Sequence, residues 1–513
     1  MECGSISQKG SSLMGRPPPS PRRSTYMNVS AAVNKMLGDI RTQDLAFLIP
    51  LQLARENVPN LHFAKAHWTI KKGKPSGRPL GDLSCVDGTP LNTPATAKAA
   101  ADYYGKIVHP TIDDIAVMIC NFWRQTKAEN PQAFFSDLIM WKMDLRGAYQ
   151  LLSFRPEDVG LFAMMLTDDL VYFQIAGIFG WAGTPAAFQV VTRAISWELK
   201  HQLKSATLMY VDDVIGVGLK KEIDADIVAA KKICTNLLGP KAVAEEKIEK
   251  DRRIDAIGYT IDLNTQRILI AQKKYLTALH GFCSIDVSAG ALINLKSAQR
   301  IASWGSRYGK ICRVMRPFCG AMNMMIKHRL NKYALLRLSN EAAIAVKCWR
   351  AMLCLVRYSE NEFSRTLSSF TPSASDIIGE FDASLQGAGL VWYIRTENTE
   401  KAVGVCAVEL SFLDFGDDSS YQNLSEFIGA ILVVAGQVIM GYQGQSVSLR
   451  GDSITALTWA VTEHTRGAIV TRAAMVWTLL CVAADIHIHE VMHIPGVEND
   501  VCDSLSRRCS KHT

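Results

Sequence analysis

The chain has 513 residues, enough for about three domains, and its 48% hydrophobic and 20% charged residues are the composition of a folded globular protein. Its thirteen cysteines are scattered, without Cys-x-x-Cys pairs or zinc-finger spacing, which argues against a disulfide framework and indicates reduced thiols inside the cell, in the cytoplasm or nucleus. The first 25 residues lack an apolar core, and the longest apolar run, 429–440, is too short to span a bilayer, so we expect no membrane partner.

Charge is distributed unevenly along the chain. The net charge is +7, yet residues 271–358 contain fifteen Lys or Arg against two acids, and residues 376–509 contain seventeen acids against seven bases. This pattern favours a polyanion that is held by the basic block and processed by the acidic one. A solvated helical surface is the alternative interpretation of the basic block.

The N-terminal part begins with a segment of low hydrophobicity. Residues 1–27 are rich in Ser, Pro and Gly, which predicts a disordered basic leader. Residues 67–82 then predict two strands joined by a glycine-rich basic turn that contains Lys71, Lys72 and Arg78. Such a turn can fold over a triphosphate, although exposed basic turns are mostly just solvated.

Two motifs follow in which single residues stand out. Within 141–150, Asp144 is expected at the end of a strand, and the bulky aromatic Tyr149 comes five residues later. Within 175–196, the stretch Phe179–Pro185 places a proline after a small polar residue, which is a signal for the start of a helix.

The stretch 208–218 contains the adjacent aspartates Asp212 and Asp213 between short apolar runs, which predicts a strand, a tight turn and a strand. An ordinary hairpin turn is the alternative, and the acidic pair within 167–170 is interpreted as such a turn. Adjacent carboxylates repel, and a divalent cation between them reverses that balance. Together with Asp144 they fit a two-metal nucleotidyl-transfer site, which needs carboxylates on neighbouring strands.

Taken in order, these motifs resemble those of a reverse transcriptase over residues 67–270. Lys-Lys-Gly-x-x-x-x-Arg-Pro-Leu-x-Asp, at 71–82, resembles the fingers motif. The first three palm motifs are resembled by the stretches 144–149, 179–189 and 210–213. Lys247 is a looser match to the fourth palm motif, and 257–259 resembles the primer grip.

The resemblance implies roles for individual residues. Asp144, Asp212 and Asp213 would be the catalytic metal ligands, with Asp212 a more direct ligand than Asp213, and Tyr149 would be the steric gate against ribonucleotides. Phe179 stands where the best-known retroviral enzymes have glutamine, and other family members also have phenylalanine there. The implied nucleotide-binding residues are Lys71, Lys72, Arg78, Tyr149, Phe179, Gly180 and Lys247.

The C-terminal part follows a Ser/Thr/Pro-rich stretch, 364–375, that predicts a linker. Four acids are expected on a strand, a helix, a strand end and a second helix, and they suit a second two-metal site, for hydrolysis: Asp382, Glu426, Asp452 and Asp503. The residues around them, at 381–389, 423–426, 451–453 and 495–507, resemble ribonuclease H.

One departure from that family concerns a histidine. Many ribonucleases H carry a catalytic histidine between the proline and the asparagine of this last motif, whereas Pro495–Asn499 has none and His493 precedes the proline. Retrotransposon enzymes of the long-terminal-repeat and tyrosine-recombinase (DIRS-like) types often share the short loop and the ending Asn-x-x-x-Asp-x-Leu-Ser-Arg.

The expected fold class is α/β (α+β), a right-hand polymerase followed by an RNase H-like mixed domain. The expected segments are a leader (1–27), fingers and palm (28–270), a basic helical thumb or connection (271–363), the linker (364–375) and the RNase H-like domain (376–510). The expected activity is RNA-directed DNA synthesis with hydrolysis of the RNA strand of hybrids, using two Mg²⁺ or Mn²⁺ per site. The expected partners are an RNA template, a DNA primer, an RNA–DNA hybrid and dNTPs.

Two alternatives belong to other classes. One is a catalytically inactive nucleic-acid-binding scaffold derived from a retroelement polymerase, against which stand the intact carboxylates. The other is an RNA-templated polymerase that makes RNA, against which stands Tyr149. The sequence leaves the oligomeric state open.

Overall fold

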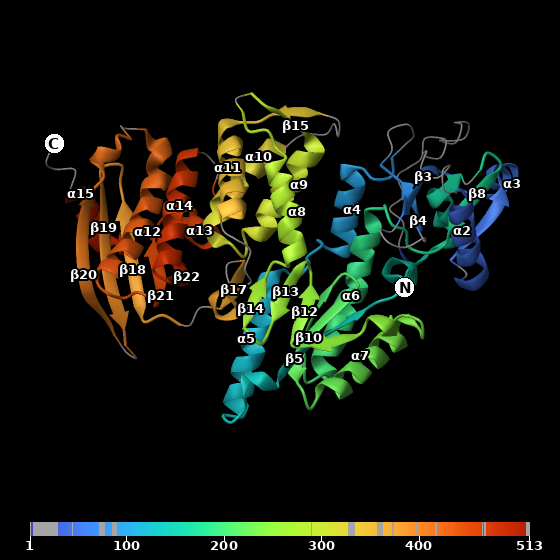
Figure 1. Ribbon diagram of the computed structural model, residues 1–513, viewed down its shortest axis with the longest axis horizontal. Helices are drawn as coiled ribbons and strands as arrows, with labels where there is room; N and C mark the ends of the chain where they lie inside the picture. The colour runs from blue at the N-terminus through green and yellow to red at the C-terminus, as the bar shows by residue number, and fades with distance from the viewer. Residues whose placement is uncertain are drawn as a thin grey trace. The chain divides into compact units, whose positions relative to one another are not determined.

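The structure is a computed structural model that divides into two compact units, Met1–Ile257 and Gly258–Thr513 (Figure 1). Most of the expected leader, together with Lys71 and Lys72, falls outside the residues that it describes. The described residues are 2–3, 29–43, 45–70, 77–84, 90–165, 167–288, 290–326, 334–355, 363–371, 374–396, 399–415, 418–463, 465 and 468–508.

Unit 1 contains helices and two main sheets. Its helices are α2 (Val29–Gln43), α3 (Leu51–Asn57), α4 (Pro94–Tyr104), α5 (Ile112–Glu129), α6 (Gly183–Gln202) and α7 (Ile223–Leu238). Its strands are β1 (Glu2–Cys3), β2 (Ala46–Pro50), β3 (Phe63–Ile70), β4 (Gly77–Asp82), β5 (Leu138–Asp144), β6 (Ser153–Phe154), β7 (Ala163–Met165), β8 (Leu170–Gln174), β9 (Ala206–Tyr210), β10 (Asp213–Leu219), β11 (Glu249–Asp251) and β12 (Arg253–Ala256).

The two sheets of unit 1 have the orders β2-β8-β7-β3-β4 and β11-β5-β10-β9. The second sheet is antiparallel, and α5, α6 and α7 pack against it (Figure 1). The close approach of β5 and β10 depends on Gly216, because a Cβ there would lie 2.3 Å from Nε1 of the buried Trp141. A glycine therefore fixes the separation of the two strands that carry the acidic motifs.

Unit 2 begins with a helical part. Its helices are α8 (Gln272–Cys283), α9 (Leu295–Tyr308), α10 (Cys319–Ile326) and α11 (Asn340–Leu355), and its strands are β13 (Tyr259–Asp262), β14 (Arg267–Leu269), β15 (Leu292–Asn294), β16 (Leu335–Arg337) and β17 (Ser364–Thr366). Phe282 and Trp349 stack at 5.6 Å between α8 and α11 and anchor a buried core.

Two of the expected segments, which stay predictions, can be compared with the elements of the structure. The palm was expected to continue to residue 270; the chain divides after Ile257, so the hairpin β13–β14 falls within unit 2, where β14 pairs with β17. The stretch 364–375, expected to be a linker, begins with β17 and continues as the 3₁₀ turn Leu367–Phe370. Backbone pairing with β14 outweighs its Ser/Thr-rich composition.

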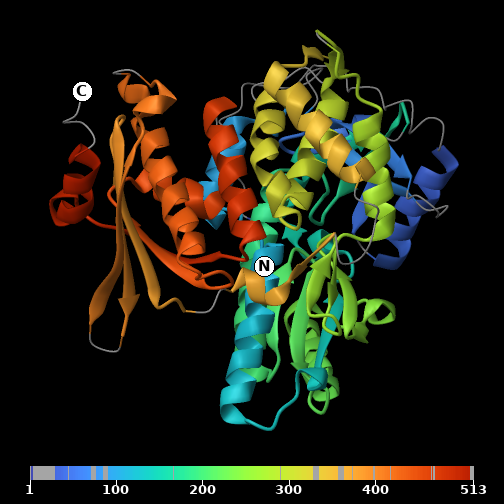
Figure 2. The same cartoon turned by 60° about the vertical axis from the view of Figure 1, so that its left-hand side comes forward.

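The C-terminal part of unit 2 is a five-stranded sheet of order β20-β19-β18-β21-β22, in which β18, β21 and β22 are parallel neighbours. Helices α12, α13 and α14 cover one face, and α15 lies on the other (Figure 2). The bounds are β18 (Ile377–Ala383), β19 (Gly387–Arg395), β20 (Glu400–Glu409), β21 (Ser446–Gly451), β22 (His487–His493), α12 (Gln422–Ile439), α13 (Ile454–Thr462), α14 (Ala468–Ala483) and α15 (Asp500–Arg508).

A buried ion-pair cluster joins the two parts of unit 2. Glu463, 1% exposed, follows α13 with a positive φ of 53°. Its carboxylate accepts hydrogen bonds from Arg313 Nε at 3.0 Å, from Arg313 Nη2 and from Arg316 Nη1 at 3.2 Å. Both arginines lie in the 3₁₀ segment η5 (Arg313–Phe318), which packs on α14. We refer to these three residues as the Glu463 cluster.

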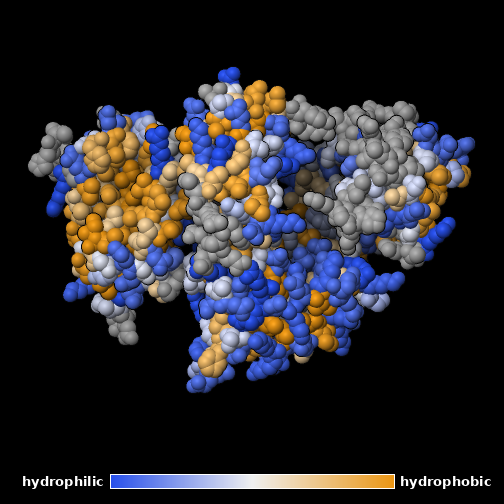
Figure 3. All heavy atoms as spheres, in the orientation of Figure 1, coloured by the Kyte–Doolittle hydropathy of each residue, from blue (hydrophilic) through white to orange (hydrophobic). Residues whose placement is uncertain are grey.

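Helix α12 is the most apolar long helix that the structure describes. A segment containing it, Ser419–Ile439, is long and apolar enough to cross a membrane by length and composition, but 56% of its most apolar part is buried in the protein. Hydrophobic side chains also gather over α12 on the face seen in Figure 3. Packing on the sheet accounts for much of its apolar character, as in any central helix.

Candidate active sites

The acidic motifs of unit 1 meet at the ends of two paired strands. Asp144 closes β5, Asp213 opens β10, and the two are register partners in the antiparallel ladder. The turn between β9 and β10 contains Val211 and Asp212, and Val211 has a φ of 55°, which is strained for a β-branched residue. Leu145 N donates to Asp212 O at 2.8 Å and ties the turn to the end of β5.

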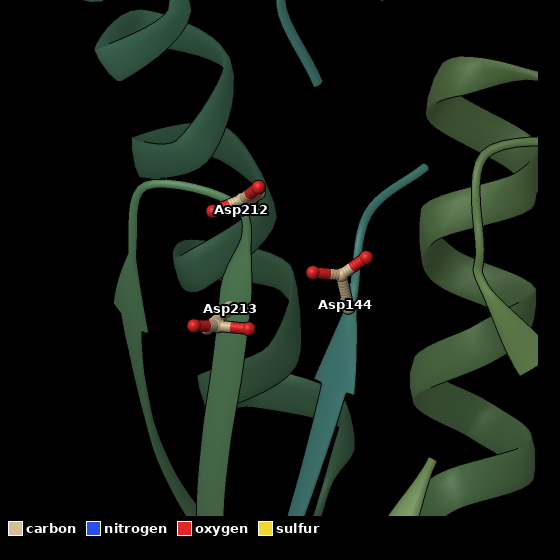
Figure 4. A group of neighbouring side chains, drawn as sticks. All are labelled: Asp144, Asp212 and Asp213. Atoms are coloured by element: carbon tan, nitrogen blue, oxygen red, sulfur yellow. The ribbon is translucent and has the colours of Figure 1, made fainter. Parts of the chain in front are cut away.

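The three carboxylates form one group. An oxygen of each of Asp144, Asp212 and Asp213 lies within 4.8 Å of the others (Figure 4). Burial raises the pKa of Asp213 to about 6, with repulsion from Asp212 and Asp144 adding to the effect. Such a cluster of oxygen ligands, with one carboxyl held above its ordinary pKa, fits divalent cations of the magnesium type.

Lysines counter part of this negative charge. Lys247 Nζ lies 2.5 Å from Asp144 Oδ2, and Lys142 and Lys247 both lower the pKa of Asp213. Lys247 was expected to contact the nucleotide, whereas here it is paired with Asp144. Its role with a nucleotide stays a prediction.

The expected ribose wall is an aromatic group beside the acids. Tyr149 lies in a 3₁₀ turn after β5, with its ring 5.0 Å from that of Phe179 and 5.7 Å from that of Phe188. Burial raises the pKa of Tyr149, and Asp212 contributes, which places the phenol in the field of the acidic group. The sequence-predicted Tyr149 and Phe179 therefore do come together.

Asn92 is a positioning residue that we did not predict. Its Nδ2 donates to Gly180 O at 2.5 Å, and its Oδ1 accepts from Ala182 N at 2.8 Å. Gly180 has a φ of 112°, and a Cβ there would lie 2.5 Å from Gly81 O. Asn92 N also donates to Leu83 O at 3.0 Å, so Asn92 joins the loop at 180–182 to the segment that directly follows β4. The backbone of β4 includes Arg78, whose side chain lies outside the described part of the structure.

The C-terminal carboxylates converge on one end of the second sheet. Asp382 lies near the end of β18, and Asp452 directly follows β21, its parallel neighbour. Glu426 comes from α12, which packs on β18, and an oxygen of each of the three acids lies within 4.8 Å of the others. The sheet topology therefore gathers residues that are seventy positions apart.

Burial makes this second group electrostatically unfavourable without a cation. Glu426 is 5% exposed, its Oε2 is buried without a hydrogen-bond partner, and its pKa is raised to about 8 by burial and by Asp382 and Asp452. The pKa of Asp382 is also raised, first by burial. An orphaned carboxylate oxygen beside two further acids fits a divalent cation.

Asp503 lies at the rim of this group. Its carboxylate pairs with Arg507 at 2.8 Å and helps to raise the pKa of Asp382, yet it is not among the three mutually close acids. Ser506 Oγ, one turn along α15, donates to Asp382 Oδ2 at 2.6 Å.

Two further contacts position this site. Gln422 Nε2 donates to Ala383 O at 2.6 Å and to Glu426 Oε1 at 3.1 Å. Asn499 Nδ2 donates to Phe381 O at 3.0 Å and so ties the loop before α15 to β18. Asn499 and Ser506 were part of the matched motif but had no assigned role, and Gln422 carried no sequence signal. His493 is exposed at the end of β22.

Comparisons with known proteins complete these observations. No protein-family model and no curated protein matches the chain. A foamy viral protease–reverse transcriptase in complex with an RNA/DNA hybrid matches 94% of this chain and 55% of its own, at 12% identity and a TM-score of 0.44. The foamy viral protein in complex with double-stranded DNA matches 94% of this chain and 86% of its own, again at 12% identity and a TM-score of 0.44. RNase H1 from the halophilic archaeon Halobacterium salinarum matches 27% of this chain and 98% of its own, at 17% identity and a TM-score of 0.22.

Proposed function

We propose that the protein is an RNA-directed DNA polymerase whose C-terminal part hydrolyses the RNA strand of RNA–DNA hybrids. The observation that carries the proposal is the pairing of Asp213 with Asp144, which gathers three carboxylates within 4.8 Å on neighbouring strands. Two-metal nucleotidyl transfer needs this arrangement, and the order of the sequence motifs assigns it to a reverse transcriptase.

In unit 1, Asp144, Asp212 and Asp213 would hold Mg²⁺ or Mn²⁺. Two such cations supply a more nucleophilic primer 3′-hydroxyl and neutralise the charge of the leaving pyrophosphate. Tyr149 would stand against the ribose 2′ position, so that dNTPs are accepted and ribonucleotides excluded. Asn92 would hold the loop at 180–182 in place along the template and the incoming nucleotide.

In unit 2, Asp382, Glu426 and Asp452 would hold the cations for hydrolysis, with Asp503 completing the set when the substrate is bound. Ser506 and Gln422 orient two of these carboxylates through hydrogen bonds. The basic stretch 271–358 would hold the hybrid for the acidic C-terminal part, since phosphates are bound by lysine and arginine. The motif endings favour a retrotransposon of the long-terminal-repeat or tyrosine-recombinase type as the source.

The test is primer extension on an RNA template with magnesium or manganese, with primer and RNA strand labelled separately. We expect dNTP-dependent extension of the primer and shortening of the RNA strand in the same reaction. An inactive nucleic-acid-binding scaffold would bind the hybrid and leave both strands unchanged. Incorporation of NTPs in preference to dNTPs would instead favour an RNA-making polymerase.

A further inference from the structure

Two cysteines of the helical part of unit 2 lie side by side at the surface. Of the ten cysteines whose side chains the structure describes, Cys283 and Cys354 are the two that are exposed. Their Sγ atoms are 3.7 Å apart, although 71 positions separate them in the sequence. Cys283 is the last residue of α8, and Cys354 is one residue before the end of α11.

The two helix ends are held together by contacts on both sides of the thiols. Arg350 of α11 donates to the backbone carbonyls of Phe282, at 3.1 Å, and of Ile285. In the other direction, the Tyr275 hydroxyl of α8 donates to Leu353 O at 2.6 Å. The thiols therefore face each other across a fixed helix pair.

We propose that Cys283 and Cys354 form a modification site, a dithiol that low-molecular-weight disulfides oxidise reversibly to an intramolecular disulfide. A disulfide needs its sulfur atoms about 2.05 Å apart, so the thiols have less than 2 Å to close. Exposure gives the oxidant access, while the cysteines buried in the core are protected. An anionic disulfide such as oxidised glutathione is favoured, because the surrounding stretch 271–358 is strongly basic.

The exchange is balanced in two steps. One cysteine thiolate attacks a sulfur of the small disulfide, forms a mixed disulfide and releases one small thiolate, which takes up a proton. The second cysteine thiolate then attacks the protein-bound sulfur and releases the second small thiolate. The protein has lost two hydrogens as protons and two electrons, and the small disulfide has been reduced to two thiols.

The product would lock α8 to α11. The chain between the two cysteines includes α9 and α10, so the new bond closes a long loop that also contains much of the basic stretch. Cross-linking reduces the freedom of the unfolded chain, more for long loops than for short ones. We therefore expect the oxidised protein to unfold at a temperature about 2–5 °C above that of the reduced protein.

The experiment treats the reduced full-length protein with oxidised glutathione under native conditions. Peptide mapping without reductant should give one linked pair, containing Cys283 and Cys354 and lacking two hydrogens, and dithiothreitol should reverse it. C283S and C354S should each abolish the linked pair and the shift in unfolding temperature. C348S changes a half-buried cysteine of α11, the helix of Cys354, and should preserve both the linked pair and the shift in unfolding temperature.

Three results would overturn the proposal. The first is two separate glutathione adducts on Cys283 and Cys354 with no linked peptide. The second is a linkage that survives in C283S or C354S through another cysteine. The third is a linked pair with an unchanged unfolding temperature, which would mean that the bond does not lock the helices. None of these depends on polymerase or nuclease activity.

Discussion

The two acidic groups of this protein use the same side chains in different surroundings. In unit 1 the three carboxylates lie on adjacent antiparallel strands and a tight turn, partly exposed, with Lys247 paired to one of them. In unit 2 they come from parallel strands and a helix, and Glu426 is buried with an oxygen that has no partner. Burial raises the pKa of Asp213 to about 6 and that of Glu426 to about 8, so the two sites differ in the pH at which an acid loses its proton.

The largest effect is expected from removing one acid from each group. Asp212→Asn should lower DNA synthesis by roughly a thousandfold or more and leave hybrid cleavage intact, because it removes a charge only from the first group. Asp452→Asn should do the reverse. Extension and cleavage assays on the same labelled hybrid measure both, and survival of both activities in both variants would contradict the assignment of two sites.

The next effect concerns Asn92 in unit 1. Asn92→Ala removes two hydrogen bonds to the loop at 180–182 and should lower kcat/KM for dNTP incorporation about thirtyfold, since each bond contributes about 1 kcal/mol. Asn57→Ala, which changes an exposed asparagine bonded only within its own helix, is the matched control. Hybrid cleavage should be unchanged in both variants, and a parallel loss of cleavage would indicate general misfolding.

A third comparison uses pH. Glu426 must lose its proton to bind a cation, so below pH about 8 protons compete and the magnesium concentration for half-maximal cleavage should rise about tenfold per pH unit. For DNA synthesis the corresponding rise should begin only below about pH 6, where Asp213 takes up its proton. Magnesium titrations between pH 5 and 9 measure both. Coincident curves would show that burial does not distinguish the sites.

The smallest effect is on the stability of the metal-free protein. The unfolded chain releases the Glu426 proton near its ordinary pKa, whereas the folded protein keeps it up to about 8, so the free energy of unfolding falls as pH rises across that window. Glu426→Gln should therefore raise the free energy of unfolding by about 2 kcal/mol at pH 9 and much less at pH 5. Denaturant unfolding in EDTA tests this, with exposed Glu498→Gln as the control. An equal change at both pH values would argue against a raised pKa.

Much of unit 1 could be predicted because its signals are local. Apolar runs that end in acids predict strands, and the turn between two such runs places Asp212 and Asp213 at its tip. The proximity of Asp144 was inferred from the need of a two-metal site for neighbouring carboxylates and from the family resemblance, because pairing between β5 and β10 joins residues far apart in the sequence and leaves no local signal.

Long-range contacts explain what was missed. Asn92 and Gln422 are ordinary polar residues until the fold brings a carbonyl or a carboxylate to them. Composition also did not reveal the strand β17 within 364–375, because a Ser/Thr-rich stretch can pair only where a free strand edge lies elsewhere, here that of β14.

The Glu463 cluster has a consequence for how such a chain can be divided or exchanged. Cutting at the Ser/Thr-rich stretch would take Arg313 and Arg316 away from Glu463 and remove the partner of β14. Breaking a buried ion pair of this kind typically costs about 3–5 kcal/mol, a large part of the stability of a single domain. The C-terminal part of unit 2 therefore cannot be separated at this stretch without a loss of stability. A C-terminal part transferred to another chain would need to bring η5 with it, and exchange between related chains should preserve the segment from η5 to α13 as one block.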